Sequence, residues 1–437
     1  MTRLVVNIAA DGLSAAVKVS AGPAATRAEL DAELRRAGVV HGLDQAALQA
    51  LTELLRDPAQ TGEHIVARGD APQHGADGRL DPAFTLGQIV GEVCKDGHVD
   101  FHERRLLQPI ADGEHIASVH APTAGTPGTD VRGRTLPAKP GVAARFRLGP
   151  GARLTDTNIV ATRGGVILAD DKSVDVVPLY QHRGDVDLES GNLHSEGSLE
   201  IAGDVCDGFA ATASGDVLVH GLVQSASVTA QGSVHVDQGV LGAESQVTAG
   251  VDLSCRHATA AQLQAGGTIL VRDQLAHCRA RAERILLVEG RGQAFGGELR
   301  ARVSIEVSAA GTKEGAATLL AIADLLDERA GLAQLTSEAA RATRVATRGD
   351  NAGGRISKGK GTRLAVRAED RSETERLRLI ARQRELLANA SVVIRDVAHV
   401  GVRIQLGDLV RHIDAPRHAV RYRYDRDQHQ ILEEYLP

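Results

Sequence analysis

The chain contains few of the residues that build large mixed cores or reactive sites. Its 437 residues include no Trp, one Met and only 2% aromatic residues, although 43% are hydrophobic. The four cysteines, Cys94, Cys206, Cys255 and Cys278, form no CxxC pair, which favours buried free thiols over disulfides or a metal site. No stretch approaches the roughly 20 apolar residues that a membrane-spanning helix needs.

Charge and the first residues exclude two further classes of protein. The formal net charge is −6, so bulk electrostatics predicts no polyanionic partner. The opening sequence, MTRLVVNIAADGLS, lacks the charged segment and unbroken apolar run of a signal peptide, so we expect a cytoplasmic location. A chain of 437 residues is expected to form two to four domains.

What the sequence does contain is a repeat of apolar pairs. Between residues 199 and 305 the pairs recur at steps of 17 or 18 residues. The two members of a pair are two positions apart, so both face the same side of a strand. The pairs are Leu199/Ile201, Val217/Val219, Val234/Val236, Val251/Leu253, Ile269/Val271, Leu286/Val288 and Val303/Ile305.

A second series of apolar pairs lies between the first. A fixed period of this length predicts a solenoid, in which each coil buries its apolar side only against its neighbours. The coil is too short for a helix, so we predict a parallel β-helix, whose narrow interior suits the low aromatic content. An irregular β-sandwich would not give so many nearly equal steps. The second series is Ala211/Ala213, Val228/Ala230, Val247/Ala249, Leu263/Ala265, Ala280/Ala282 and Leu299/Ala301.

The segments around the repeat have different patterns. A strand hairpin and two helices beginning near Thr26 and Asp44 open the chain, with Thr26 and Glu29 as a predicted capping box. We predict an N-terminal α/β module at 1–60, an irregular β region at 61–183, the parallel β-helix at 184–310, an antiparallel coiled-coil helical hairpin at 311–391, and C-terminal strands that join the β-helix at 392–437.

The helical hairpin is predicted because the apolar period changes to three and four residues after the solenoid. Its first helix is expected from Gly315 to about Thr343 and its second over about 369–389. The predicted apolar stripes are Ile322, Leu325, Leu332 and Leu335 in the first helix and Leu377, Ile380 and Leu387 in the second.

Four blocks of sequence also resemble a known family. They are IVARGDAPQHGADGRL (65–80), IADGEHIASVHAPTAGTPGTDVRGRTLP (110–137), GDVDLESGNLHSEGSLEIAGDVCDGF (184–209) and GVRIQLG (401–407). In this order they resemble the flagellar assembly protein A family of bacterial proteins. The resemblance implies an N-terminal α/β region, a right-handed β-helix and a coiled-coil arm, and it alone supplies the handedness. In place of the aromatic-proline pair that family members usually carry, this chain has His399-Val400.

Candidate cofactor and metal motifs are weak. Residues 354–362 nearly spell a phosphate-binding loop, but Gly361 occupies the place where Ser or Thr must follow the Lys. His98 and His102 are four residues apart in a strand pattern, which favours surface histidines over a metal site. We therefore expect no cofactor and no metal.

Candidate catalytic carboxylates are equally weak. Asp204 and Asp216 follow glycines in successive coils and could supply the paired acids of a polysaccharide-degrading β-helix enzyme. Gly-Asp is more simply explained as turn chemistry, so we expect no catalytic residue.

One charge cluster stands out near the expected end of the hairpin. Eight basic residues between positions 341 and 367 are opposed only by Asp350. The cluster is either a solvated loop or a binding site, and we predict an acidic protein partner first and nucleic acid second. The residues are Arg341, Arg344, Arg348, Arg355, Lys358, Lys360, Arg363 and Arg367.

These observations predict a non-enzymatic cytoplasmic scaffold or adaptor that acts through protein–protein interaction. The resemblance implies a role in assembling or placing the flagellum. Two alternatives remain open. One is a nucleic-acid-associated regulator acting through the N-terminal module or the basic cluster, and the other is a carbohydrate-active β-helix enzyme.

Overall fold

The computed structural model describes two compact units of this mainly β chain. The described residues are 4–84, 91–93, 95–96, 99–170, 172–287, 291–351 and 360–437. The first unit comprises residues 1–85, 113–161 and 169–174, and the second comprises 86–112, 162–168 and 175–437. No helix in these described ranges has both the length and the apolar character needed to cross a membrane.

The first unit opens with an antiparallel sheet in the order β1-β2-β3. Its strands are β1 (Leu4–Ile8), β2 (Ser14–Val19) and β3 (Gly62–Arg68), and its helices are α1 (Arg27–Arg36) and α2 (Gln45–Leu54). The prediction that this module ends at residue 60 was wrong, because β3 completes its sheet. The buried face collects Leu4, Val17, Val19, Leu30, Leu34, Leu48, Leu51, Leu55 and Val66.

Both helices begin at capping residues that the sequence identified. The Thr26 side chain accepts from the backbone N–H of Glu29, whose carboxylate accepts from the N–H of Thr26, which confirms the capping box. The Asp44 carboxylate accepts from the N–H groups of Ala46 and Ala47 at 3.0 Å.

Short strands follow in both units, and most of them pair antiparallel. One four-stranded sheet has the order β12-β13-β8-β4. The bounds are β4 (Arg79–Pro82), β5 (Glu92–Val93), β6 (Val99–Asp100), β7 (Pro109–Ile110), β8 (His115–His120), β9 (Gly128–Thr129), β10 (Thr135–Leu136), β11 (Arg147–Leu148), β12 (Ala152–Thr155), β13 (Asn158–Ala161), β14 (Gly165–Ala169) and β15 (Ser173–Val177).

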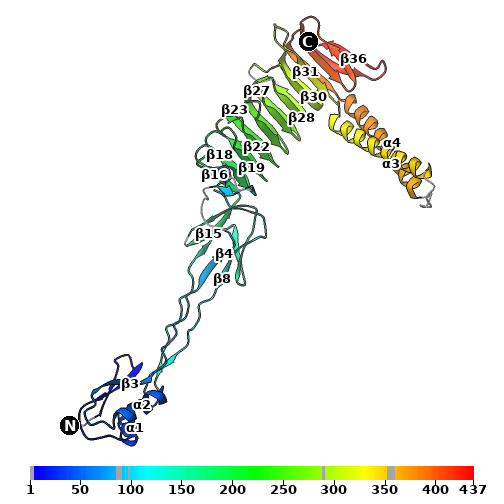
Figure 1. Cartoon of the computed structure of the whole chain (residues 1–437). Coiled ribbons are helices and arrows are strands. Elements are labelled where there is room, and N and C mark those ends of the chain that lie inside the picture. Colours follow the sequence, from blue (N-terminus) through cyan, green and yellow to red (C-terminus); the bar gives the residue numbers. More distant parts are fainter. Residues whose placement is uncertain are drawn as a thin grey trace. The chain divides into compact units, whose positions relative to one another are not determined.

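The second unit is dominated by a parallel β-solenoid of about seven turns, stacked in one column (Figure 1). This confirms the predicted solenoid. Its strands are β16 (Leu179–His182), β17 (Leu193–Ser195), β18 (Ser198–Ile201), β19 (Ala210–Ala213), β20 (Val217–Val219), β21 (Val223–Gln224), β22 (Ser227–Ala230), β23 (Val234–Leu241), β24 (Gln246–Ala249), β25 (Leu253–Thr259), β26 (Gln262–Ala265), β27 (Thr268–Ala276), β28 (Arg279–Leu287), β29 (Gln293–Phe295) and β30 (Glu298–Ala310).

Three walls of parallel strands enclose the interior. Wall A holds β17, β19, β22, β24 and β26. Wall B begins with β16, β18 and β20. Wall C contains β21 and the bridge between Val205 and Val223. The longer strands bend at bulges from one wall to the next, as β23 does between Val236 and Gly239. Because each wall stacks equivalent residues, one coil's inward side chains lie directly on those of the next.

The inward stacks confirm most of the predicted pairs and correct three. All pairs of the second series are buried in wall A, and Val219, Val236 and Ile269 are buried in wall B. Val251, however, is 50% exposed, and the buried pair of its coil is Leu253/Cys255. Two later coils also differ, because their buried pairs are Ile285/Leu287 and Ile305/Val307. The predicted pairs there were Leu286/Val288 and Val303/Ile305, and Val288 lies outside the described residues.

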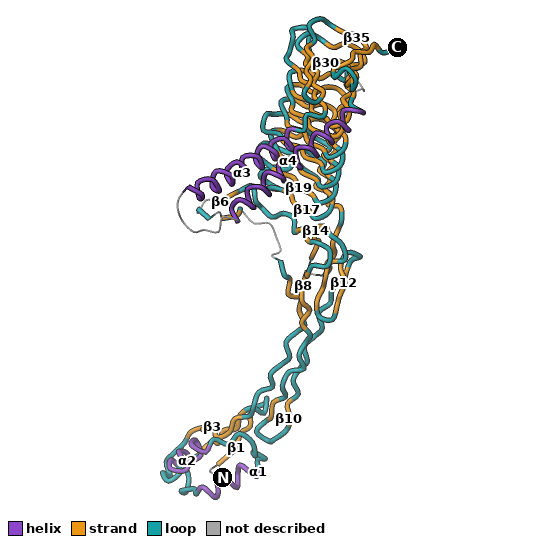
Figure 2. Tube along the Cα trace, turned by 90° about the vertical axis from the view of Figure 1, so that its right-hand side faces the viewer, coloured by secondary structure: helices purple, strands orange, loops and turns teal. Residues whose placement is uncertain are grey.

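A paired helical arm leaves the solenoid after the strand Thr318–Ile322. The helices α3 (Leu326–Asn351) and α4 (Lys360–Ala388) run side by side (Figures 1 and 2), and we call them the arm. With α1 and α2 they are the four helices of the described residues. The expectation of helix from residue 315 was wrong: β31 (Thr318–Ile322) is a strand paired with both β30 and β33. All five residues of β31 are buried, and such a short apolar run has no period that separates strand from helix.

The last strands end the parallel stack. β32 (Ser391–Ala398) is parallel to β30, and β33 (Val402–Leu406) is parallel to β31. The strands β34 (Leu409–His412), β35 (Arg417–Asp425) and β36 (Gln430–Tyr435) then pair antiparallel. Tyr422, fully buried, lies here, and burial raises the pKa of its phenol to about 12.

The wall B register predicts the effect of a buried charge. Val236 lies between Val219 and Cys255 of the adjacent coils and is fully buried. Val236→Asp would place an unpaired carboxylate in the stack, so we expect a large fall in melting temperature, measured by circular dichroism. Leu218→Asp is the control, because Leu218 points outward on β20 and should cost far less. An unchanged melting temperature for Val236→Asp would refute the register.

Candidate interaction surface

The arm leaves and re-enters the solenoid beside a single strand. The last residue of β31, Ile322, is registered with Ala301 of β30. The first residue of β32, Ser391, is registered with Ser304 of the same strand. Three residues of strand span about 10 Å. The whole arm is therefore an insertion between two points that are close together in the solenoid.

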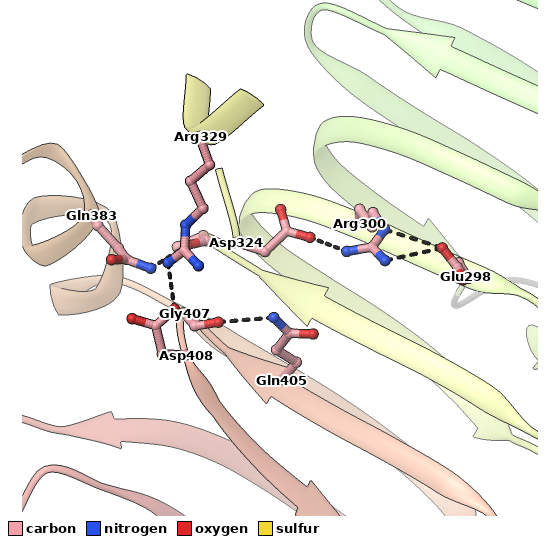
Figure 3. A network of polar contacts seen from close by, with 9 residues as sticks. Glu298, Arg300, Asp324, Arg329, Gln383, Gln405, Gly407 and Asp408 are labelled. Carbon is pink, nitrogen blue, oxygen red and sulfur yellow. Dashed lines mark hydrogen bonds and ion pairs between the residues drawn. The ribbon is translucent and has the colours of Figure 1, made fainter. Parts of the chain in front are cut away.

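An ion pair holds the turn that leads into α3. Ala323 and Leu325 have positive φ values of 55° and 47°, a left-handed conformation that costs about 1–2 kcal/mol per residue. Between them, Asp324 forms an ion pair with Arg300, which also donates to Glu298 at 3.0 and 3.2 Å (Figure 3). The side chains of Arg300 and Asp324 are only 17% and 12% exposed, so salt screens this pair weakly.

Two further polar contacts hold the base of the arm, one made by each helix. Arg329 of α3 forms an ion pair with Asp408, next to the turn at Gly407 (Figure 3). From α4, the amide of Gln383 donates to the backbone carbonyl of Ala323 at 3.1 Å. The base of each helix is thus tied to the solenoid by its own polar contact.

The seam between the two helices is narrow. Leu332 and Leu335 of α3 are half-buried, as is Leu379 of α4. A groove of about 590 Å³ lies over these three leucines. Near the base, Arg382 of α4 lies 3.9 Å from Glu328 of α3. The arm therefore combines a thin apolar seam with charged edges.

Only one of the three residues of the predicted α4 stripe is buried. Leu387 is buried, but Leu377 is 60% exposed and Ile380 is 37% exposed. Leu379 instead lines the groove beside Leu332 and Leu335, whereas Leu386 and Leu387 pack against the core of the solenoid. Helix α4 has apolar residues on two sides, and their spacing cannot tell which side meets α3.

The structure describes only part of the predicted basic cluster. Arg341 and Arg344 lie on α3 and Arg367 lies on α4, all with exposed side chains. Arg355 and Lys358 lie outside the described residues, as do the side chains of Arg348, Lys360 and Arg363. By sequence, residues 326–388 contain fourteen Lys or Arg against nine Asp or Glu, although the whole chain has a net charge of −6.

The aspartates Asp204 and Asp216 lie between strands and bond to the following coil. Asp204 Oδ1 accepts from the backbone N–H of Leu222 at 2.7 Å, and Asp216 Oδ1 accepts from that of Ser233 at 2.7 Å. Each carboxylate therefore satisfies a backbone donor of the following coil. Asp185 and Asp252 make equivalent bonds.

The other weak candidates remain separate. His98 and residues 354–359 of the loop-like motif lie outside the described residues. His102 is hydrogen-bonded to Asp100 at 3.0 Å and lies 4.7 Å from the ring of Phe209. Within the described part of the chain, no group of three or more His, Cys, Asp or Glu could hold a metal ion.

A polar chain on wall B was missed by the sequence reasoning. His220 is hydrogen-bonded to Asp237 at 2.6 Å and to Glu200 at 3.2 Å, and His235 is hydrogen-bonded to Asp237 at 2.8 Å. Asp237 and then Glu200 raise the pKa of His220. In return, His220 lowers the pKa of Asp237. The signal was available, because His220 and Asp237 are one 17-residue coil apart.

The arrangement defines a β-solenoid protein with an inserted helical arm. Residues 4–172 match the family model of the Flagellar Assembly Protein A N-terminal region, and residues 178–431 match that of the Flagellar Assembly Protein A beta solenoid domain. The chain therefore belongs to the Flagellar Assembly Protein A family. No curated protein and no solved structure matches it.

The position of the arm predicts that it can be removed. Replacing residues 326–388 with about eight Gly/Ser residues should leave the solenoid folded, since such a linker easily spans ~10 Å. Losing the buried Leu387 should still cost about 1.5–3 kcal/mol. Circular dichroism and thermal melting would measure both effects.

A longer replacement provides the control for the arm boundary. Removing residues 318–388 also deletes β31, which pairs with β30 and β33, so this variant should lose cooperative melting. Equal behaviour of the two replacements would contradict the boundary at residue 326.

The polar chain predicts a pH-dependent contribution to stability. A raised histidine pKa stabilises the fold below the ordinary histidine pKa, and this contribution is lost as the pH rises through the raised value. The lowered pKa of Asp237 adds stability above the ordinary carboxyl value. His220→Ala should therefore lower the melting temperature more near pH ~5.5 than near pH ~8.5. An equal loss at both pH values would contradict this coupling, and His220→Gln tests whether charge is required.

Proposed function

We propose that this protein is a non-enzymatic scaffold or adaptor that assembles or places flagellar components, with the arm as its partner-binding surface. The observation that carries the proposal is the arm's attachment beside Ala301 and Ser304 of one strand. A solenoid that does not need an inserted arm for its stack can present that arm to a partner. Family membership supports the flagellar context.

Charge supports an acidic partner for the arm. Its fourteen basic and nine acidic residues oppose the net charge of −6 on the whole chain. Arg341, Arg344 and Arg367 have exposed side chains on this arm. Exposed charge of this kind supports recognition of an acidic partner.

Finer features of the architecture belong to the same proposal. We propose right-handed coils, following the family's implied architecture, and an antiparallel coiled coil for the arm. The spacing of Leu332, Leu335 and Ala339 along the seam supports the coiled coil. A cytoplasmic location is supported by free thiols at Cys206 and Cys255. Burial raises the pKa of Cys255 to about 12, which makes its thiol unreactive.

The described part of the basic cluster gives a direct test. Arg341→Ser, Arg344→Ser and Arg367→Ser together should leave the melting temperature nearly unchanged, because exposed substitutions usually cost within about 0.5 kcal/mol each. The triple variant should lose capture of its acidic protein partner, measured by quantitative pull-down from the native cell, and wild-type capture should weaken with salt. Swimming of cells carrying the variant provides a second readout.

The matched control removes the same charge nearer the base. Arg371→Ser, Arg376→Ser and Arg378→Ser together should retain capture, since these exposed residues lie outside the predicted cluster. Undiminished capture by the first triple variant would contradict the proposed surface. Capture that nuclease treatment abolishes would instead support the nucleic-acid-associated alternative.

A further inference from the structure

The outer face of α4 carries a short stripe of four residues. Glu373, Leu377, Ile380 and Arg384 are spaced by four, three and four positions, so they share one side of the helix. The order is acid, apolar, apolar, base. Glu373 and Arg384 lie at equal distances along the helix, on opposite sides of the midpoint between Leu377 and Ile380.

The side chains of this stripe are exposed in the described part of the chain. Leu377 and Ile380 are 60% and 37% exposed, and Arg384 is exposed as well. Glu373 forms one exposed ion pair, with Arg376 at 3.8 Å, a kind of contact that contributes little. Leu379 lines the seam with α3, so the stripe points elsewhere.

We propose that this stripe is a dimer interface, occupied by α4 of a second copy of the chain running antiparallel. A two-fold axis midway between Leu377 and Ile380 packs Leu377 of each copy against Ile380 of the other. The same axis brings Glu373 opposite Arg384 of the second copy, twice. One surface is thereby complementary to itself, which is the requirement for an isologous interface.

Charge complementarity selects this occupant and this direction. In a parallel pair, Glu373 would face Glu373 and Arg384 would face Arg384, and like charges repel. A uniformly acidic helix would be repelled by Glu373 and by exposed Asp370. The antiparallel second copy is the arrangement that pairs both ends of the stripe.

The stripe also sets the strength of the contact. Stable protein interfaces use roughly 20–30 residues on each side, far more than these four. We therefore expect a weak dimer whose population rises with concentration. Its formation does not depend on the proposed basic surface, because the stripe shares no residue with Arg341, Arg344 and Arg367.

The first test is the oligomeric state of the full chain. Sedimentation analysis over a wide range of concentration should show a monomer–dimer equilibrium. Leu377→Asp with Ile380→Asp should weaken dimerisation at least about tenfold, with an unchanged melting temperature because both residues are exposed. A wild-type chain that stays monomeric at the highest concentration, or a double variant that dimerises normally, would overturn the proposal.

Charge reversal tests the antiparallel direction. Glu373→Arg and Arg384→Glu should each weaken the dimer, and the two changes in one chain should restore it. Mixing the two single variants should also give a heterodimer. Glu385→Arg is the matched control, since this exposed acid on α4 lies off the stripe and should not change the equilibrium. Failure of the combined variant to dimerise would overturn the proposed pairing.

Cross-linking tests the register. Along the helix axis, Glu373 of one copy lies about 16 Å from Glu373 of the other, since eleven residues separate positions 373 and 384. A mixture of Glu373→Cys and Arg384→Cys chains should therefore form a disulfide-linked heterodimer. Disulfide-linked homodimers of Glu373→Cys alone would overturn the register.

Discussion

The fold depends on one packing constraint, the stacking of each inward side chain on its equivalent in the next coil. Because the strands are parallel and registered, a wall can hold only residues that fit above and below themselves. Val217, Val234 and Leu253 illustrate this in wall B, and Val223, Val240 and Ala258 illustrate it in wall C. Small aliphatic side chains fill such a narrow space without the gaps or clashes that rings would introduce.

The same stacking decides what happens at the corners, where strands end and backbone donors lose their ladder partners. Asp204 and Asp216 accept hydrogen bonds from backbone N–H groups of the following coil. Their carboxylates therefore link adjacent coils where the strand ladder is interrupted. Outward side chains also lie next to their equivalents in the neighbouring coil, which brings His220 and Asp237 together. A solenoid period therefore organises polar contacts as strictly as apolar ones.

How far the sequence predicts the fold follows from this constraint. Alternation identified the wall A pairs from Ala211/Ala213 onward, because most of their residues have polar neighbours on both sides. It missed the buried Leu193 and Ser195 of β17, because the second member of that pair is polar. Alternation fails where apolar residues are consecutive: in Ile285-Leu286-Leu287 a shift of one position exchanges the inward and outward faces. The buried run in β31 carries no period at all, and it was mistaken for helix. The sequence did not predict wall C, because many of its inward residues are alanines, which are only weakly hydrophobic.

The arm was predictable as an insertion, but its contacts were not. Helical spacing identifies two helices, whereas the choice between Leu379 and Leu377 for the seam depends on how α4 is rotated. That rotation is fixed at the base, where Gln383 of α4 bonds to Ala323 and Arg329 of α3 pairs with Asp408. These partners are far apart in the sequence, and no local pattern connects them.

The attachment of both ends of the arm beside β30 explains how the solenoid accommodates an insertion of this size. Coils contact only their neighbours, so an insertion need not disturb the stack if both its ends return to one strand. β30 provides that strand, with β31 and β32 alongside it. The left-handed turn at Ala323 and Leu325 opposes the arrangement, and Asp324 between them pairs with Arg300 of β30 at the same turn. The arm is thus firmly held at its base, and the outer side of α4 remains available for recognition.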